Sequence, residues 1–420
     1  MANPTSGRSV EATGPVRTVE AVGAGQVMRK DKLLILAVFV VLVCAAVGLQ
    51  QFGWQDGLTD RGSQPAPGVA PTVPGPLKPV NVDQFRGFSL QLQSHSPTHP
   101  YPTYISEIAA TGANTVCLVV AAYQENCDST SIFVDARRTP SDEQVQRLIG
   151  HAHKEGLRVV FMPIVLLENP RAGEWRGKID PKNWDDWWED YDNYILHYAH
   201  VAQAARAELL VVGSELVSTE KDHGNRWRGL IGRVRKVFKG HLSYSANWDH
   251  YRPVSWWDAV DIIGMTTYYD LTEGGKPTVE RLLAGWRPIR KEILEWQRTI
   301  NRPILFTEVG WPNQVTCAQY PWDYTRNPDK PDPTAQANCF EAFFRTWINE
   351  KAVAGFLVWE WRNHPNQKIG PEETGYVPCG KPALDVIRKY YQSPDPRSET
   401  TQPTSAPATS PASRPATRPK

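Results

Sequence analysis

The sequence predicts an α/β protein in which a (β/α)8 TIM barrel follows a single transmembrane helix and a Pro-rich linker. Three observations predict this architecture. Short apolar, β-branched segments alternate with longer amphipathic ones through the middle of the chain. One uncharged apolar run near the N-terminus is separated from them by a Pro-rich stretch. The chain has 420 residues, which is enough for one large barrel with tails.

The N-terminal part predicts a membrane anchor. Residues 1–32 are polar and end in Arg-Lys-Asp-Lys, and residues 33–49 form the apolar run LLILAVFVVLVCAAVGL. This run lies at the lower end of the length that spans a hydrocarbon core. No Lys or Arg follows it until Arg61, so the positive-inside rule predicts a single-pass protein of the cell membrane, with residues 1–32 cytoplasmic and the rest extracytoplasmic. A cleaved signal peptide is the alternative, but the leader is long and no A-x-A-type site follows the run.

Two low-complexity segments flank the predicted folded domain. Residues 50–82 contain QPAPGVAPTVPGPLKPV, which is typical of an extended, semi-rigid linker. Residues 393–420 are rich in Pro, Ser and Thr and are predicted to be a disordered tail. The predicted barrel therefore occupies residues 83–392.

Eight strands are predicted within this domain, and their near-continuous apolar character is typical of a parallel sheet buried on both faces. They are 86–92, 115–120, 158–164, 209–213, 242–246, 260–265, 303–307 and 355–359. Helical patterns lie between them, such as 184–205 and 141–154, where Ser141 and Gln144 resemble a capping box. A closed barrel is favoured over a doubly wound open sheet, because no Gly-rich phosphate loop follows the first strand.

Composition narrows the classes of function. Lys and Arg number 46 against 45 Asp and Glu, and this balance argues against a nucleic-acid partner. The 16 Trp are many, and their flat rings suit the stacking of sugars. The acids of the 184–205 helix are interpreted as its solvated face. Neither His-Glu-x-x-His nor EF-hand spacing occurs, so no metal site and no cofactor are predicted.

Two glutamates follow buried strands at positions that favour catalysis. Glu215 ends the segment LLVVGSEL and Glu308 lies in PILFTEVGW, at the carboxyl ends of the fourth and seventh strands, where barrel active sites gather. A charge at such a position is costly unless it is paired or functional. Glycoside cleavage needs one protonated and one ionised carboxyl group. Among the other acids, Glu360 lies between Trp359 and Trp361, so strand alternation points it away from their shared face and it is interpreted as structural. Glu168 and Glu220 are interpreted as possible rim residues.

Several segments in order carry a resemblance to a known family. They include AHKEGLRVVFMPIVLL, EWRGKI, SANWDH, FTEVGWP and GFLVWEW. Over nearly all of residues 83–392 the sequence resembles glycoside hydrolase clan A and, within it, family 113, whose founding members are β-mannanases. The resemblance implies a retaining hydrolase that cleaves a β-1,4-linked, mannan-like polysaccharide by double displacement. Glu215 would be the acid/base and Glu308 the nucleophile.

The same resemblance implies roles for other residues. Tyr268 would hydrogen-bond the nucleophile, with the adjacent Tyr269 as the alternative, and Trp359 would form the floor under the sugar at the cleavage point. Neighbouring subsites would be lined by Trp175, Asn247, Trp248 and Trp311. Ser214 stands where clan members commonly have Asn, which contacts the sugar 2-hydroxyl. This departure bears on the identity of the sugar, and the mechanism requires no cofactor.

Two other functions compete with this one. The first is the same chemistry used to trim or transglycosylate a self-made envelope exopolysaccharide, which the predicted anchor favours. The second is a catalytically silent scaffold that binds glycan, against which both glutamates and Tyr268 argue. The sequence leaves the oligomeric state open.

The six cysteines are compatible with an extracytoplasmic location. Cys44 lies in the apolar run, and Cys117 is predicted to be buried in the second strand. Either a Cys317–Cys379 or a Cys317–Cys339 disulfide is plausible, and the sequence does not choose between them.

Overall fold

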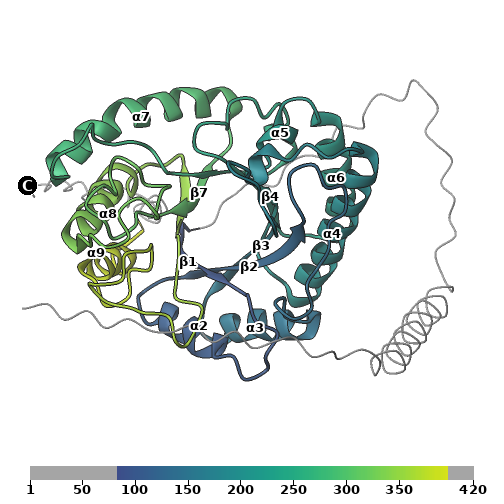
Figure 1. Ribbon diagram of the computed structural model, residues 1–420, viewed down its shortest axis with the longest axis horizontal. Coiled ribbons are helices and arrows are strands. Elements are labelled where there is room, and N and C mark those ends of the chain that lie inside the picture. The colour runs from purple at the N-terminus through teal and green to yellow at the C-terminus, as the bar shows by residue number, and fades with distance from the viewer. Residues whose placement is uncertain (1–82, 396–420) are drawn as a thin grey trace, which may run out of the picture. The chain divides into compact units, whose positions relative to one another are not determined.

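The structure, a computed structural model, describes residues 83–395, and these form a closed barrel of eight parallel strands surrounded by helices (Figure 1). Each strand pairs with the next in sequence, and β1 pairs with β8 to close the ring. The strands are β1 (Phe85–Gln91), β2 (Thr115–Gln124), β3 (Arg158–Leu167), β4 (Leu209–Ser214), β5 (His241–Ala246), β6 (Ile262–Thr266), β7 (Ile304–Val309) and β8 (Val353–Val358). The predicted (β/α)8 barrel is therefore confirmed.

Helices connect the strands on the outside of the ring. They are α2 (Tyr101–Ala109), α3 (Asp142–Lys154), α4 (Trp184–Ala205), α5 (Val217–Glu220), α6 (Gly224–Val237), α7 (Val279–Ile300), α8 (Pro333–Trp347) and α9 (Pro382–Tyr391), with 3-10 turns at Arg176–Lys178 and Trp257–Ala259. The predicted capping box of α3 is present. Ser141 Oγ accepts the Gln144 N–H, and the Gln144 side chain accepts the Ser141 N–H.

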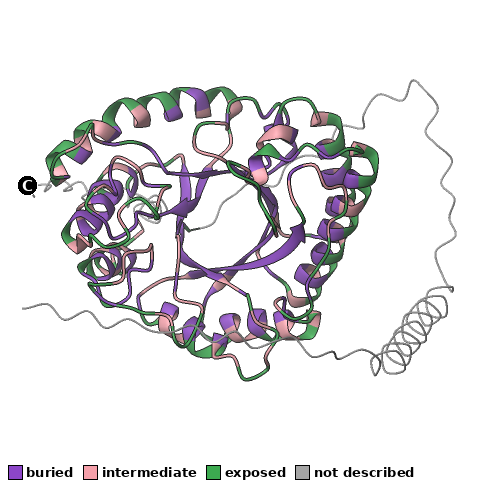
Figure 2. Cartoon of the chain, in the orientation of Figure 1, coloured by how far each residue is buried: buried purple, intermediate pink, exposed green. Residues whose placement is uncertain are grey.

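Apolar side chains fill the molecule in two layers, one inside the barrel and one between the strands and the helices. The inner layer includes Val119, Met162, Leu209, Leu305 and Leu357, all at most 2% exposed. Cys117 lies in this layer with no exposed surface, as predicted. Because both faces of the sheet are covered, the strands are buried along almost their whole length (Figure 2).

The strand bounds differ from the predicted ones mainly at β2 and β3. These two strands pair in register over ten residues, so both run further than the apolar runs that marked them in the sequence. Strand β8 begins two residues earlier than predicted, because Val353 pairs with Ile304 of β7. Such extensions depend on a partner strand, which local sequence does not reveal.

The predicted cytoplasmic segment, anchor and linker, residues 1–82, and the tail from residue 396 lie outside the described residues. Within residues 83–395, no helix combines the length and apolar character needed to cross a membrane.

Candidate active site

Glu215 follows β4 directly and lies at the carboxyl end of the barrel. Its backbone takes the left-handed conformation, with φ 53°, which is uncommon for a residue other than glycine. Two hydrogen bonds hold this turn. The Glu215 N–H donates to the Ser245 carbonyl of β5 at 2.8 Å, and the Leu216 N–H donates to the Tyr244 hydroxyl at 3.0 Å. The carboxyl group is thereby fixed at the mouth of the barrel.

Aromatic rings of α4 and α6 press against the backbone of β4 just before this turn. A Cβ atom on Gly213 would lie 2.6 Å from the Tyr191 hydroxyl and 2.7 Å from the Trp227 ring, so only glycine fits. Tyr191 also donates a hydrogen bond to the Val212 carbonyl at 2.8 Å. This aromatic layer sets the position of the strand that carries Glu215.

Glu308 is the second-last residue of β7 and is almost completely buried, with 4% of its surface exposed. The Tyr268 hydroxyl donates to Glu308 Oε2 at 2.9 Å, whereas Glu308 Oε1 is buried with no hydrogen-bond partner among the described residues. Burial and the neighbouring Glu215 raise the pKa of Glu308 to about 8, against the lowering effects of Arg176 and Tyr268. Burial and Glu308 also raise the pKa of Tyr268, so its hydroxyl keeps the proton that it donates.

Arg176 lies between the two carboxyl groups and was not predicted from the sequence. Its Nη2 atom is 2.7 Å from Glu215 Oε2 and 3.7 Å from Glu308 Oε1. Burial opposes the charge of Arg176, but the two glutamates outweigh it and raise its pKa. The sequence offered one signal for this role: Arg176 is a cationic residue in the EWRGKI segment, and two buried glutamates at strand ends need a cation to balance them.

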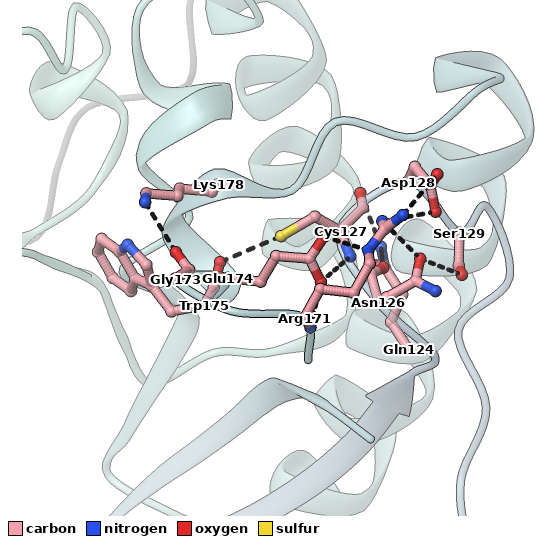
Figure 3. A network of polar contacts seen from close by, with 10 residues as sticks. All are labelled: Gln124, Asn126, Cys127, Asp128, Ser129, Arg171, Gly173, Glu174, Trp175 and Lys178. Atoms are coloured by element: carbon pink, nitrogen blue, oxygen red, sulfur yellow. Dashed lines mark hydrogen bonds and ion pairs between the residues drawn. The ribbon is translucent and has the colours of Figure 1, made fainter. Parts of the chain in front are cut away.

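The loop that carries Trp175 and Arg176 is fastened to the loop after β2 (Figure 3). Cys127 Sγ donates to the Trp175 carbonyl at 3.5 Å, and Arg171 Nε contacts Glu174 Oε1 at 2.7 Å. The Trp175 ring folds over Gly177, where a Cβ atom would lie 2.3 Å from it. The half-buried Trp175 ring and the backbone next to Arg176 are therefore held by contacts of these loops.

Trp359 follows β8 and is partly buried against the interior of the barrel. Its N–H donates to the Val309 carbonyl at 2.9 Å, one residue beyond Glu308. A Cβ atom on Gly310 would lie 2.5 Å from the Trp359 carbonyl, so this glycine allows the ends of β7 and β8 to approach each other closely. The structure thus brings the backbone of Trp359 to the end of β7, one residue from Glu308.

Glu360, interpreted from the sequence as a structural residue, lies within electrostatic reach of this site. It accepts a hydrogen bond from Gln91 Nε2 at the end of β1, and its charge raises the pKa of both Glu308 and Tyr376. Strand β8 ends at Val358, so the two-residue alternation that supported the earlier interpretation no longer applies here.

The tyrosines at the end of β6 have separate roles. Tyr268 contacts Glu308, whereas the Tyr269 hydroxyl donates to the Trp248 carbonyl at 2.8 Å and supports the loop after β5. In that loop the Asn247 side chain donates to Asp249 at 2.7 Å. The Trp248 ring stacks on Trp322 with centroids 6.0 Å apart.

Trp322 and Tyr324, in the loop between β7 and α8, were missed by the sequence analysis. They are 44% and 58% exposed, an unusual position for large aromatic side chains. Tyr376 connects this loop to Tyr268, the partner of Glu308, because its ring lies 6.0 Å from those of both Tyr324 and Tyr268. Aromatic rings therefore continue outward from the site.

Three other predicted positions differ from expectation. Trp311 has no exposed surface and packs edge-on against Phe340 and Phe343, so it belongs to the core and presents no face to a subsite. Glu220 is fully buried and accepts the Tyr244 hydroxyl at 2.7 Å, so it is not a rim residue. Ser214 is 1% exposed, and its Oγ has no hydrogen-bond partner within residues 83–395.

Of the two disulfides left open by the sequence, the geometry favours the Cys317–Cys339 pair. Their Sγ atoms lie 3.9 Å apart as neighbouring thiols, and both side chains are fully buried.

A closed (β/α)8 barrel with two buried glutamates at the ends of β4 and β7, bridged by one arginine, has the form of a glycoside hydrolase. Comparison with known proteins defines this class further. Residues 99–381 match the model of Glycoside Hydrolase Family 113, and the chain belongs to this family. A search of curated proteins found no match.

Solved structures of the same family are similar over most of the chain. A GH113 β-1,4-mannanase complex is 27% identical, with a TM-score of 0.65, and covers 74% of this chain and 100% of its own. The GH113 β-mannanase AaManA from Alicyclobacillus acidocaldarius, in complex with ManMIm, is 29% identical, with a TM-score of 0.65 and coverage of 74% and 98%. An endo-β-1,4-mannanase from Thermotoga petrophila is 11% identical, with a TM-score of 0.51 and coverage of 74% and 76%, and shares the fold.

Proposed function

We propose that this glycoside hydrolase cleaves a β-1,4-linked, mannan-like polysaccharide with retention of configuration, by double displacement. The observation that carries the mechanism is the contact of one Arg176 nitrogen with both glutamates. Distances of 2.7 and 3.7 Å from that nitrogen place Glu215 Oε2 and Glu308 Oε1 no more than about 6.4 Å apart. Retaining enzymes hold their carboxyl groups roughly 5–5.5 Å apart, and inverting enzymes about 6.5–9.5 Å.

In the first step, Glu308 attacks the anomeric carbon and Glu215 gives a proton to the leaving glycosidic oxygen. The bond to that oxygen breaks as a covalent glycosyl–Glu308 ester forms. Tyr268 donates a hydrogen bond to Oε2 of the nucleophile, at 2.9 Å, and stabilises its ionised form. In the second step, Glu215 takes a proton from water, which attacks the same carbon and releases the sugar with its original anomeric configuration.

Arg176 allows the pair to hold one negative charge and one proton. Two buried carboxylates repel each other, which raises the pKa of Glu308. The guanidinium group lowers that pKa, and its Nη2 atom would need to move by only about 1 Å to contact Glu308 as closely as it contacts Glu215. We infer that substrate binding moves the ion pair toward Glu308, which would leave the nucleophile ionised and Glu215 free to carry the proton.

The choice of a mannan-like substrate is supported by the two solved β-mannanases of the same family, at 27% and 29% identity. The aromatic rings of Trp359, Trp175 and Trp248 around the carboxyl pair provide faces for sugar rings. Ser214 stands in place of the expected asparagine, and its buried hydroxyl has no hydrogen-bond partner among the described residues.

A product assay tests the proposal. Residues 83–395 are incubated with β-mannan, glucomannan, xylan, β-glucan and chitin oligosaccharides, and the first-formed anomers are followed by NMR. Release of β-anomers from the mannan substrate is expected. Release of α-anomers would contradict retention, and cleavage of another polymer in place of mannan would contradict the substrate.

Variants of the two glutamates test their separate roles. Glu308→Ala should abolish turnover, and added azide should give the α-glycosyl azide, because it attacks from the face that Glu308 has vacated. Glu215→Ala with azide should give the β-azide. Glu292→Ala, an exposed acid on α7, is the matched control. If Glu308→Ala cleaves as fast as the unchanged protein, the assignment is wrong; binding without turnover in the unchanged protein would indicate a silent scaffold.

We also propose that residues 33–49 anchor the enzyme in the cell membrane with the barrel on the extracytoplasmic side. The support is the uncharged apolar run, the basic residues that precede it and the absence of Lys or Arg before Arg61. A residue in an extended Pro-rich linker spans about 3.1 Å, so the linker at 50–82 would let the barrel reach roughly 100 Å from the bilayer. Protease accessibility in intact cells tests this, and protection of the barrel from added protease would contradict it.

A further inference from the structure

A row of polar side chains at the ends of β1 and β8 lies beside the catalytic glutamates and has no role in the double displacement. Gln91 donates to Glu360, Gln93 donates to Gln91 Oε1 at 2.7 Å, and Asn363 donates to Gln93 Oε1 at 3.2 Å. Each side-chain amide thus donates to the next acceptor in the row, and the last acceptor is the carboxyl group of Glu360. The row is exposed at Gln93 and half-buried at Gln91 and Glu360, so it forms part of a surface.

The position of this row is fixed by its neighbours in the chain. Glu360 follows Trp359 directly, and the Trp361 N–H donates to the Ser89 carbonyl of β1 at 2.8 Å, which fastens the end of β8 to β1. Glu360 therefore lies at the mouth of the barrel, next to the predicted floor of the cleavage site. A sugar seated on Trp359, or the next unit of its chain, would meet this row.

The chemistry of the row matches hydroxyl groups. A carboxylate accepts hydrogen bonds, and each amide both donates and accepts, as sugar hydroxyls do. Within residues 83–395, the cations around this row and the cleft already have anionic partners: Lys381 Nζ contacts Glu373 at 2.6 Å, Arg362 contacts Glu107, and Arg176 contacts the two glutamates. A negatively charged sugar would meet Glu360 without a cation to balance it.

We propose that Glu360, with Gln91, Gln93 and Asn363, binds hydroxyl groups of a neutral sugar unit and discriminates against acidic sugars. This inference rests on the proposed function, since it assigns part of the substrate-binding surface of the same cleft. It narrows the substrate class to neutral chains and disfavours envelope polysaccharides built from uronic acids.

The discrimination has a limit that depends on pH. Burial raises the pKa of Glu360 to about 7, with Gln91 opposing this effect and Glu373 adding to it; Glu308 and Tyr376 also lie within its electrostatic reach. An acidic ligand can therefore bind if Glu360 first takes up a proton. The need to protonate Glu360 first weakens the binding of the acidic ligand. The loss is at most tenfold per pH unit above the pKa of Glu360, which is about 30-fold at about pH 8.5 and almost nothing at about pH 6.

The test compares two ligands that differ at one carbon. β-1,4-Linked mannuronate oligomers carry a carboxylate at C6 where β-1,4-linked manno-oligosaccharides carry a hydroxymethyl group. Their Kd values are measured by calorimetry in the Glu308→Gln background, which removes turnover and the titration of Glu308. The expected result is a ratio of Kd values, mannuronate to manno-oligosaccharide, that rises by up to about 30-fold from about pH 6 to about pH 8.5.

Added substitutions identify the group responsible. Glu360→Gln should flatten this pH dependence and raise the Kd of the neutral ligand several-fold. The control Glu292→Gln, at an exposed position on α7, should change neither quantity. Gln93→Ala, at an exposed position, should weaken neutral binding and keep the pH dependence. An unchanged ratio in Glu360→Gln, a flat ratio in the Glu308→Gln protein, or no binding of the neutral oligosaccharide would overturn the inference. Turnover of β-mannan by the unchanged protein is measured separately, because its absence refutes the proposed function and leaves the Kd ratio to decide the role of Glu360.

Discussion

The substitution Arg176→Met removes the charge that both glutamates share while keeping an apolar stem of similar length. The Nη2 atom of Arg176 lies 3.7 Å from Glu308 Oε1. At an effective dielectric constant of about 20, unit charges about 4 Å apart interact by about 4 kcal/mol, which corresponds to about 3 pKa units. The Arg176 side chain is 17% exposed, so we take about half of this value and expect a rise of 1–2 units.

The direction of the change follows from the sign of the charge. A cation favours the ionised form of a carboxyl group, so its removal raises both macroscopic pKa values of the glutamate pair. The bell-shaped dependence of kcat/KM on pH should therefore move to higher pH on both limbs. At neutral pH kcat/KM should fall by about 10–100-fold, because the ionised fraction of Glu308 falls tenfold for each unit by which its pKa rises, and much of the loss should be recovered at alkaline pH.

The assay is kcat/KM for a manno-oligosaccharide across the pH range, with Arg171→Met as the control. Arg171 lies in the same loop and contacts Glu174 at 2.7 Å, so its loss can loosen the loop and lower the rate without moving the limbs of the profile. If Arg176→Met gave a lower profile with both limbs unmoved, Arg176 would be a structural residue and the electrostatic argument would be refuted.

Three further predictions follow from contacts in and around the cleft. Tyr268→Phe removes the hydrogen bond to Glu308 Oε2 and should lower kcat by about 10–100-fold, as expected for a bond to a charged group. The acid limb of the pH profile should move to higher pH, and an unchanged profile would contradict the role of Tyr268. Trp322→Ala should raise KM about 2–10-fold for long manno-oligosaccharides and Trp322→Phe less, as measured over a series of chain lengths, and equal effects at every length would exclude an extended subsite. Under oxidising conditions Cys317 and Cys339 should form a disulfide, with transfer of two electrons and two protons to a thiol oxidant, and this bond should stabilise the fold by about 3 kcal/mol. A thiol count in denaturant that detects both cysteines as free would contradict this prediction. A reductant should lower Tm only if the bond is present.

The sequence predicted the barrel and the positions of the two glutamates at its carboxyl end because both depend on local patterns. Each strand is an apolar segment between helical segments, Glu215 follows β4 directly, and Glu308 is the second-last residue of β7. Tyr268 was identified by the family resemblance, and the structure places its hydroxyl on Glu308. These features can be located from the order of residues along the chain.

The missed residues depend on distant parts of the chain. Arg176 is a loop residue whose importance appears only when the loop is folded over both glutamates. The direction of the Glu360 side chain could not be derived from strand alternation, because β8 ends at Val358. Trp311 resembled a subsite residue by its place after Glu308, but two phenylalanines of α8 bury its ring. In each case tertiary contacts decide the orientation of the side chain.

The aromatic layer behind β4 has a consequence for how such an enzyme diverges over evolutionary time. Gly213 is enclosed by Tyr191 and Trp227, so a change in any of the three would displace the turn that carries Glu215. This region should accept few substitutions, whereas the exposed loop of Trp322 and Tyr324 can change length and composition without disturbing the barrel. New substrate preferences should therefore arise first in the loop between β7 and α8, while the strand that carries Glu215 stays almost unaltered.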